Sequence, residues 1–208
     1  MTVRRSAVAA ALAGAASWTA AEYLLHRFAM HEIRGRGLAS VEHLDHHADV
    51  TYFTPNAKKA GSAAGASVIV HPLATRALGH RRAAAFTGGL LAMYAAYEVA
   101  HRRIHTHPPT NRYGRWSRRN HLRHHFGAPR RNYGVTTPVW DRLFGTGDDG
   151  AGPVVVPRRM APTWMLDDRG DVRPEFAGDY IVKGSRDVPA DQAERDRADA
   201  YANAAPRV

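Results

Sequence analysis

Three apolar stretches lie in the first half of the chain, separated by polar segments rich in histidine and arginine. Residues 6–25 and 83–100 each carry a single charge, Glu22 and Glu98. A helix of about 20 residues is long enough to cross the hydrocarbon core of a bilayer. The remaining stretch, residues 62–79, lies between these two and is interrupted by a proline and polar side chains, which indicates a short or re-entrant helix. The pattern predicts an all-α, membrane-embedded helical bundle.

The first apolar stretch has a competing interpretation as a secretory signal. Arg4 and Arg5 would form its basic end and the alanine run its apolar core. The apolar run continues past any cleavage site into Tyr23-Leu24-Leu25 and then meets a histidine motif. This continuation favours a retained membrane helix.

Charge asymmetry indicates which side of the membrane the polar segments occupy. Five Lys or Arg follow the first stretch, and nine Arg with no Asp or Glu lie between residues 99 and 140. If the chain crosses the membrane three times, both of these basic segments lie on the same side as His26 and His101. Basic residues concentrate on the cytoplasmic side. Because Arg76, Arg81 and Arg82 fall on the other side, they favour a shallow hairpin for residues 62–100. We predict an integral membrane protein whose polar, histidine-rich cap is cytoplasmic.

The composition changes after Gly145, which suggests residues 1–148 as a catalytic domain and residues 149–208 as a polar C-terminal extension. The last segment is alanine-rich without an apolar face, which is typical of a frayed helix or a partly disordered tail. We expect no site residue beyond Lys183.

Histidine is strongly over-represented, with 13 in 208 residues, and there is no cysteine. Ten of the thirteen fall into four motifs: His26-Arg-Phe-Ala-Met-His31, His43-Leu-Asp-His46-His47, His101-Arg-Arg-Ile-His105 and His121-Leu-Arg-His124-His125. On a helix, residues i, i+3 and i+4 share a face, so we expect each HxxHH to present three imidazoles to one point. The HxxxxH pair is rotated by roughly 140° in a straight helix, so it requires a helix end, a kink or two different metals.

The histidines are interpreted as metal ligands. In an ordinary basic segment they would be solvated or bind nucleic acid, but at this histidine frequency HxxHH should arise by chance about 0.05 times. One metal ion takes about four ligands, so ten histidines predict two metals with open coordination positions. We expect His71, His80 and His107, which lie outside the motifs, to be structural or solvated.

Two carboxylates are spaced to support these histidines. Glu22 lies four residues before His26 and Glu98 three before His101, so each shares a helix face with a candidate ligand. A carboxylate often accepts the second ring N–H of a ligand histidine. A charge reaching towards the membrane interface explains them equally well.

At these residues the sequence resembles the integral-membrane fatty acid hydroxylase and sterol desaturase superfamily. The resemblance covers about Glu22 to Thr146 and rests on the ordered motifs HxxxxH, HxxHH, HxxxH and HxxHH and on the closing NYGVTTPVWDRLFGT. It implies a non-haem di-metal centre, normally two iron ions, held by the ten motif histidines. It also implies that Asp141, in WDRLFGT, supports the ligands. Small carotenoid hydroxylases share similar spacings, but the closing motif points to the fatty acid and sterol branch.

The sequence thus predicts a membrane oxygenase that uses a di-iron centre, dioxygen and two external electrons to hydroxylate an unactivated C–H bond of a lipid, whether fatty acyl, sterol-like or carotenoid. A desaturase with the same centre and a zinc-dependent membrane hydrolase are alternatives. A nucleic-acid-binding module is disfavoured, because the basic residues are interleaved with histidines beside apolar helices.

The chain has no motif that would carry electrons, so the donor should be another protein, either ferredoxin-like or a haem protein. A set of unpaired arginines could steer an acidic donor towards the metals, or hold anionic membrane lipids. They are Arg102, Arg103, Arg112, Arg115, Arg118, Arg119, Arg123, Arg130 and Arg131.

Overall fold

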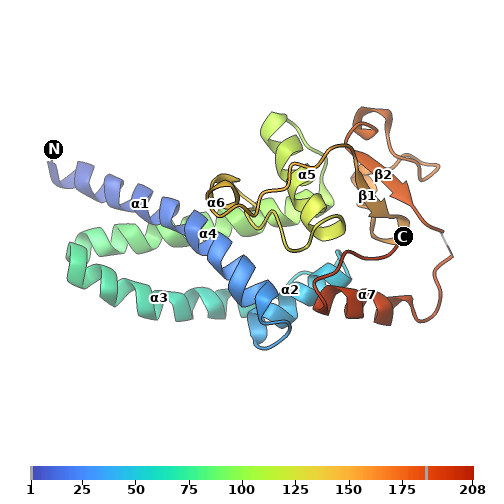
Figure 1. Ribbon diagram of the computed structural model, residues 1–208. Coiled ribbons are helices and arrows are strands. Elements are labelled where there is room, and N and C mark those ends of the chain that lie inside the picture. The colour runs from blue at the N-terminus through green and yellow to red at the C-terminus, as the bar shows by residue number, and fades with distance from the viewer. Residues whose placement is uncertain (1, 186) are drawn as a thin grey trace. The chain divides into compact units, whose positions relative to one another are not determined.

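The computed structural model describes residues 2–185 and 187–208 and is mostly helical (Figure 1). The helices are α1 Thr2–Leu24, η1 Leu25–Glu32, α2 Leu38–Ala48, α3 Asn56–Leu78, α4 His80–Thr106, α5 Arg112–Phe126, α6 Val139–Leu143 and α7 Gln192–Tyr201. Three short 3₁₀ turns, η2 Arg158–Met160, η3 Thr163–Met165 and η4 Pro174–Phe176, lie between the strands β1 Val154–Pro157 and β2 Tyr180–Lys183. The chain forms two compact units. Unit 1 contains α1 as far as Glu22 and residues 54–100, and unit 2 contains residues 23–53 and 101–208.

In unit 1, α1 and α4 cross with their backbones in contact. A Cβ atom on Gly14 would lie 1.9 Å from the carbonyl oxygen of Phe86, and one on Gly89 would lie 2.0 Å from that of Ala11. Glycine on each helix therefore permits this approach, as in helix pairs packed within membranes. The crossing is extended by Trp18, whose ring packs 4.8 Å from that of Tyr94 on α4.

Helices α3 and α4 form a hairpin (Figure 1) that turns at Gly79, where φ is +77°. An ion pair of 2.5 Å between Lys59 and Glu98 joins the two helices near the open end of the hairpin. No described residue of α3 is buried, and the exposed fraction of Val68 reaches 75%. The expected hairpin is confirmed as a pair of helices, and its apolar side chains are uncovered.

Candidate membrane spans are fewer than the apolar pattern predicts. Among the described residues, Ser6–Glu32 is the one helical stretch long and apolar enough to cross a bilayer. Residues 62–78 and 83–100 are helical, as expected, but do not meet this criterion because polar and small residues dilute their apolar runs. The number of crossings stays a prediction.

Unit 2 contains a small sheet, so the all-α prediction is wrong in this detail. Strands β1 and β2 pair in parallel, with Val154 opposite Tyr180. The sheet packs on α5, where Leu122 and Phe126 contact a cluster that includes Trp164. Each strand corresponds to an apolar run of only three residues, Val154–Val156 and Tyr180–Val182, which is too short to distinguish a strand from a loop.

The C-terminal segment, expected to be a frayed helix or a partly disordered tail, contains a packed helix. Helix α7 packs against α2: Arg197 pairs with Asp45 at 2.7 Å, and the Tyr201 hydroxyl donates a hydrogen bond to the same carboxylate at 3.0 Å. Arg159 donates two hydrogen bonds to the buried Asp196. The segment is held by ion pairs and hydrogen bonds to charged groups, which hydrophobic periodicity does not detect. A catalytic boundary at residue 148 stays a prediction.

Candidate metal centre

The HxxxxH pair lies on a π-helix. Helix α1 continues directly into η1, where i to i+5 hydrogen bonding places residues five apart above one another. His26 and His31 therefore point the same way, with ring centroids 5.2 Å apart, and both are buried. The predicted departure from a straight α-helix is confirmed.

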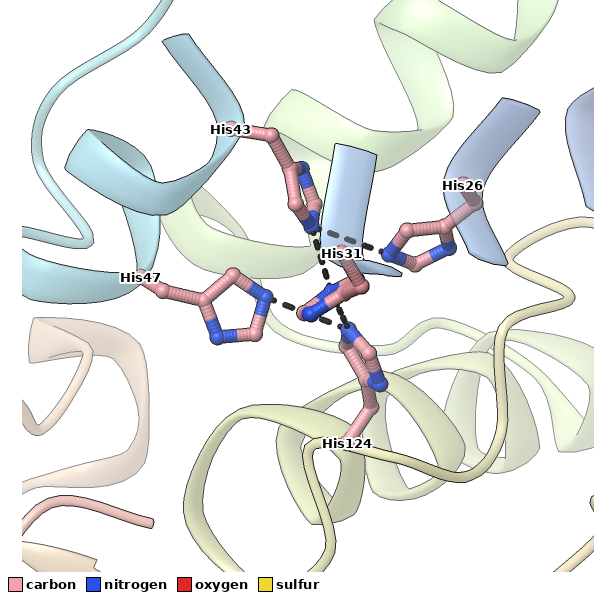
Figure 2. Close-up of side chains that lie close together, drawn as sticks. All are labelled: His26, His31, His43, His47 and His124. Carbon is pink, nitrogen blue, oxygen red and sulfur yellow. Dashed lines mark hydrogen bonds between the residues drawn. The ribbon is translucent and has the colours of Figure 1, made fainter. Parts of the chain in front are cut away.

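The ten motif histidines gather into two buried groups in unit 2. Five imidazoles form the group that we name cluster A: His26, His31, His43, His47 and His124 (Figure 2). The other five form cluster B: His46, His101, His105, His121 and His125. His71, His80 and His107 belong to neither group, and their role as structural or solvated residues stays a prediction.

Each HxxHH motif is divided between the clusters, so the expectation that its three imidazoles meet at one point is wrong. His43 and His47 belong to cluster A, whereas His46 belongs to cluster B. On α5 the assignment is reversed, with the i and i+4 histidines in cluster B and His124 in cluster A. On an α-helix, i and i+4 are only about 40° apart, whereas adjacent residues are about 100° apart. Each helix therefore faces both clusters.

Within cluster A the Nε2 atoms converge. Those of His26 and His43 lie 3.0 Å apart, those of His43 and His31 2.9 Å, those of His31 and His124 3.0 Å, and those of His47 and His124 3.1 Å. Ligands at about 2.1 Å from one metal ion would be separated by about 3.0 to 3.4 Å along the edges of its coordination shell. The spacing fits a single ion.

The opposite ring nitrogens show which form these imidazoles take. The Nδ1 atoms of His26 and His124 donate to the carbonyl oxygens of Tyr133 (2.5 Å) and Arg131 (2.6 Å). His31 Nδ1 lies 2.8 Å from the amide oxygen of Asn203. Oxygens of this kind only accept, so each neutral ring carries its proton on Nδ1 and a lone pair on Nε2. Three lone pairs facing one point cannot hydrogen-bond to one another, and a cation at that point would satisfy them.

In cluster B the Nε2 atoms of four histidines converge in the same way. The Nε2 atoms of His46 and His105 lie 3.2 Å apart, and His121 Nε2 lies 3.0 Å from those of His105 and His125. His46 Nδ1 donates to the carbonyl of Tyr52 at 2.7 Å. Within the described residues, the buried Nδ1 atoms of His105, His121 and His125 have no hydrogen-bond partner.

Burial keeps these imidazoles neutral. It lowers the pKa of His43, His47 and His121 well below the usual value, and the neighbouring histidines lower it further. A neutral imidazole is the form that binds a metal ion. The clusters also adjoin, since the rings of His47 and His125 stack with centroids 4.0 Å apart. Two metal ions could thus be held side by side.

Asp141 supports cluster A through the backbone. Its buried carboxylate accepts hydrogen bonds from the amides of Tyr133 (2.9 Å) and Gly134 (2.7 Å) and from the hydroxyl of Thr146 (2.8 Å). The carbonyl of the same Tyr133 receives the His26 N–H. Asp141 is thus linked to His26 through the backbone of Tyr133.

The two glutamates are placed in unit 1. Glu98 forms its ion pair with Lys59, and Glu22 is buried. Support of His26 by Glu22 and of His101 by Glu98 stays a prediction.

Several of the arginines that were expected to face a partner instead bind backbone carbonyls. Arg118 is buried and donates to the carbonyls of Arg103, His107 and Gly114 at 2.8 to 3.0 Å. Arg123 donates to Gly152 at 2.9 Å. These guanidinium groups hold loops in place, so the expected arginine surface is smaller than the sequence suggests.

Sequence reasoning missed Asn203 and the carbonyls of Tyr52, Arg131 and Tyr133. A backbone acceptor leaves no residue-type signal, and a lone asparagine in a polar tail has no motif. Only the fold places these groups on the histidines.

Fold and site together define a mostly helical protein with two adjoining, buried clusters of five histidines, each of which could hold a metal ion. The chain belongs to the fatty acid hydroxylase family, whose profile matches residues 11–146.

Individual proteins that are similar to this chain are hydroxylases as well. The chain is 31% identical over 141 residues to the dihydroceramide fatty acyl 2-hydroxylase FAH2 of Arabidopsis thaliana, covering 64% of this chain and 58% of that protein. It is 27% identical over 133 residues to FAH1 of the same plant, covering 62% and 56%. A solved structure, full-length scs7p with only the hydroxylase domain visible, superposes with a TM-score of 0.57 at 25% identity and covers 71% of this chain and 58% of that one. The chain thus spans somewhat more than half the length of these relatives.

Proposed function

We propose that the protein is a membrane di-iron oxygenase that hydroxylates an unactivated C–H bond of a lipid. The observation that carries the proposal is the pair of adjoining five-histidine clusters, each with its Nε2 atoms converging. Bound iron would supply dioxygen activation, with two electrons taken from outside the chain. The protein's part is to hold ten neutral imidazoles and exclude bulk water from them.

A second step of the proposal assigns the ligands. Cluster A and cluster B each bind one ion through five imidazoles, and Asp141 positions His26 through the Tyr133 loop. Iron is favoured over zinc because hydroxylation requires a redox-active metal. Zinc, which has no redox chemistry, would instead support hydrolysis, and it is a plausible ion in protein as isolated.

The substrate class follows from the relatives and from the exposed apolar helices. Two similar proteins are named for action on the fatty acyl chain of dihydroceramide, so a long acyl chain is the favoured substrate. The apolar stretch Ser6–Glu32 and the uncovered side chains of α3 support a membrane location, where such a chain would be found. We place the clusters on the cytoplasmic face, where an electron-transfer protein can reach them.

Lipid analysis tests the proposal directly. Lipids from cells that express the chain should contain acyl species with one added oxygen atom, which cells expressing His124→Ala at equal protein level should lack. Loss of two hydrogen atoms without added oxygen would identify a desaturase. An unchanged acyl composition with released fatty acid or headgroup would identify a hydrolase, and both results would overturn hydroxylation.

A further inference from the structure

We propose that Asn203 is a positioning residue for cluster A, and that the C-terminal segment after β2 completes this metal site. The inference rests on the proposed function in one respect: cluster A must bind a metal ion. Asn203 lies outside residues 11–146, the part of the chain that the family profile covers.

The contact between Asn203 and His31 uses both ends of the side-chain amide. The amide oxygen lies 2.8 Å from His31 Nδ1, and the amide nitrogen donates to the His31 backbone carbonyl at 3.2 Å. A carbonyl only accepts, so the NH₂ group must face it and the oxygen must face the ring. One amide orientation satisfies both contacts and requires the ring proton on Nδ1.

This proton position matters for the metal. With Nδ1 protonated, the lone pair of His31 lies on Nε2, which is 2.9 to 3.0 Å from the Nε2 atoms of His43 and His124. His26 and His124 are set in the same way by backbone carbonyls, which no side-chain substitution removes. Of these three histidines, His31 is the one whose Nδ1 contacts a side chain. Among these three acceptors of Nδ1 protons, Asn203 is therefore the one that a side-chain substitution can remove.

The C-terminal segment that carries Asn203 is fixed by contacts with the rest of unit 2. Asn203 is buried, 9% exposed, and follows α7 with φ of +54°, a left-handed conformation that asparagine tolerates well. Upstream, Asp196 on α7 is bound by Arg159, and the Tyr201 hydroxyl donates to Asp45 on α2, the helix that carries His43 and His47. Helix α2 therefore both contributes histidines to cluster A and binds the C-terminal segment that carries Asn203.

The test compares two substitutions at one position, with zinc as the probe. Asn203→Gly removes the amide and suits the left-handed backbone, whereas Asn203→Asp keeps an oxygen acceptor for His31 Nδ1 and also tolerates that backbone. Arg195→Gln changes an exposed side chain on the same helix and is the matched control. Each full-length protein is purified in detergent, stripped with chelator and titrated with zinc, and its bound zinc and melting temperature are measured.

We expect wild type, Asn203→Asp and Arg195→Gln to bind about two zinc ions per chain. We expect Asn203→Gly to bind one ion normally and the second about 10- to 100-fold more weakly, the range seen when outer partners of ligand histidines are removed. Unchanged zinc affinity in Asn203→Gly would overturn the inference. Asn203→Asp keeps the acceptor for His31 Nδ1 but not the donor to the His31 carbonyl. Equal loss in this variant, with or without a lower melting temperature, would also overturn the inference, because the acceptor oxygen would then not be sufficient to hold the ring.

The proposed function fails separately from this inference. Wild-type protein that binds no metal would reject the metal centre as a whole. Wild type with two ions and an unaffected Asn203→Gly variant would reject only the role of Asn203.

Discussion

At the scale of residues, the site depends on which nitrogen of each imidazole carries the proton. Carbonyl oxygens of Tyr133, Arg131 and Tyr52 accept from three different histidines, and these acceptors lie in loops outside the histidine motifs. Burial alone makes the rings neutral, but it does not choose between the two neutral forms. The loops make that choice and so direct the Nε2 atoms inwards.

The division of each HxxHH motif gives a residue-level prediction. His124 and His125 are adjacent in sequence but belong to clusters A and B. Alanine at either position should reduce bound metal from about two ions to about one per chain, and the double variant should bind none tightly. Elemental analysis of the purified proteins checks the count. If His124→Ala and the double variant retained equal metal, the two clusters would not be separate sites.

A second residue-level prediction concerns Asp141. Asp141→Ala removes the acceptor for the buried amides of Tyr133 and Gly134, and a buried donor left without a partner costs about 1–3 kcal/mol. We expect a lower melting temperature and weaker metal binding at cluster A, with cluster B retained. Asp191→Ala, at an exposed ion pair, is the control and should change neither quantity. Metal loss confined to cluster B would contradict the assignment.

At the scale of elements, the sequence predicts the helices well and their faces poorly. Apolar runs indicate α1, α3 and α4 because each run is long. The prediction that each HxxHH motif presents three imidazoles to one site was wrong. Sequence spacing indicates which residues of a helix are neighbours, but not whether the helix faces one site or two. Strands β1 and β2 were missed because each has four residues, and α7 because its partners are charges.

Arg118 provides the element-level prediction, since it joins the end of α4 to the start of α5. Its three carbonyl partners lie on either side of the loop between these two histidine-bearing helices. Arg118→Met should lower the free energy of unfolding by about 3 kcal/mol, because the carbonyls lose a charged donor. It should also weaken metal binding at cluster B, whose ligands come from both helices. Thermal unfolding and zinc titration check this.

The exposed residues Arg112 and Arg130 are the matched controls and the better test of partner docking. Charge reversal at both should leave metal content and melting temperature unchanged. If an acidic electron donor docks here, its affinity should fall in this variant and in rising salt. If Arg118→Met were as stable as the control variant, the carbonyl contacts of Arg118 would contribute nothing to the free energy of unfolding.

At the scale of the whole molecule, the histidine clusters and most of the charged residues belong to unit 2, whereas unit 1 is made of long helical stretches with few charges. The ten motif histidines, most of the arginines and the C-terminal segment belong to unit 2, whereas unit 1 exposes Val68, Ile69 and Leu73 on a helix without buried residues. A mean hydropathy of −0.43 averages over this division and would by itself argue against a membrane protein. Uncovered apolar side chains on α3 need a nonaqueous neighbour, and a bilayer provides one.

The last prediction follows from this division. The full chain should sediment with membranes and resist both about 1 M salt, where the Debye length is about 3 Å, and alkaline carbonate. A variant lacking residues 2–20 separates the contributions of α1 and of the α3–α4 hairpin. Retention of that variant in the carbonate pellet would show that the hairpin also embeds, whereas its release would assign anchoring to α1. Fractionation with immunoblotting measures both, and release of the full chain by salt alone would show that arginines, not apolar helices, hold it to the membrane.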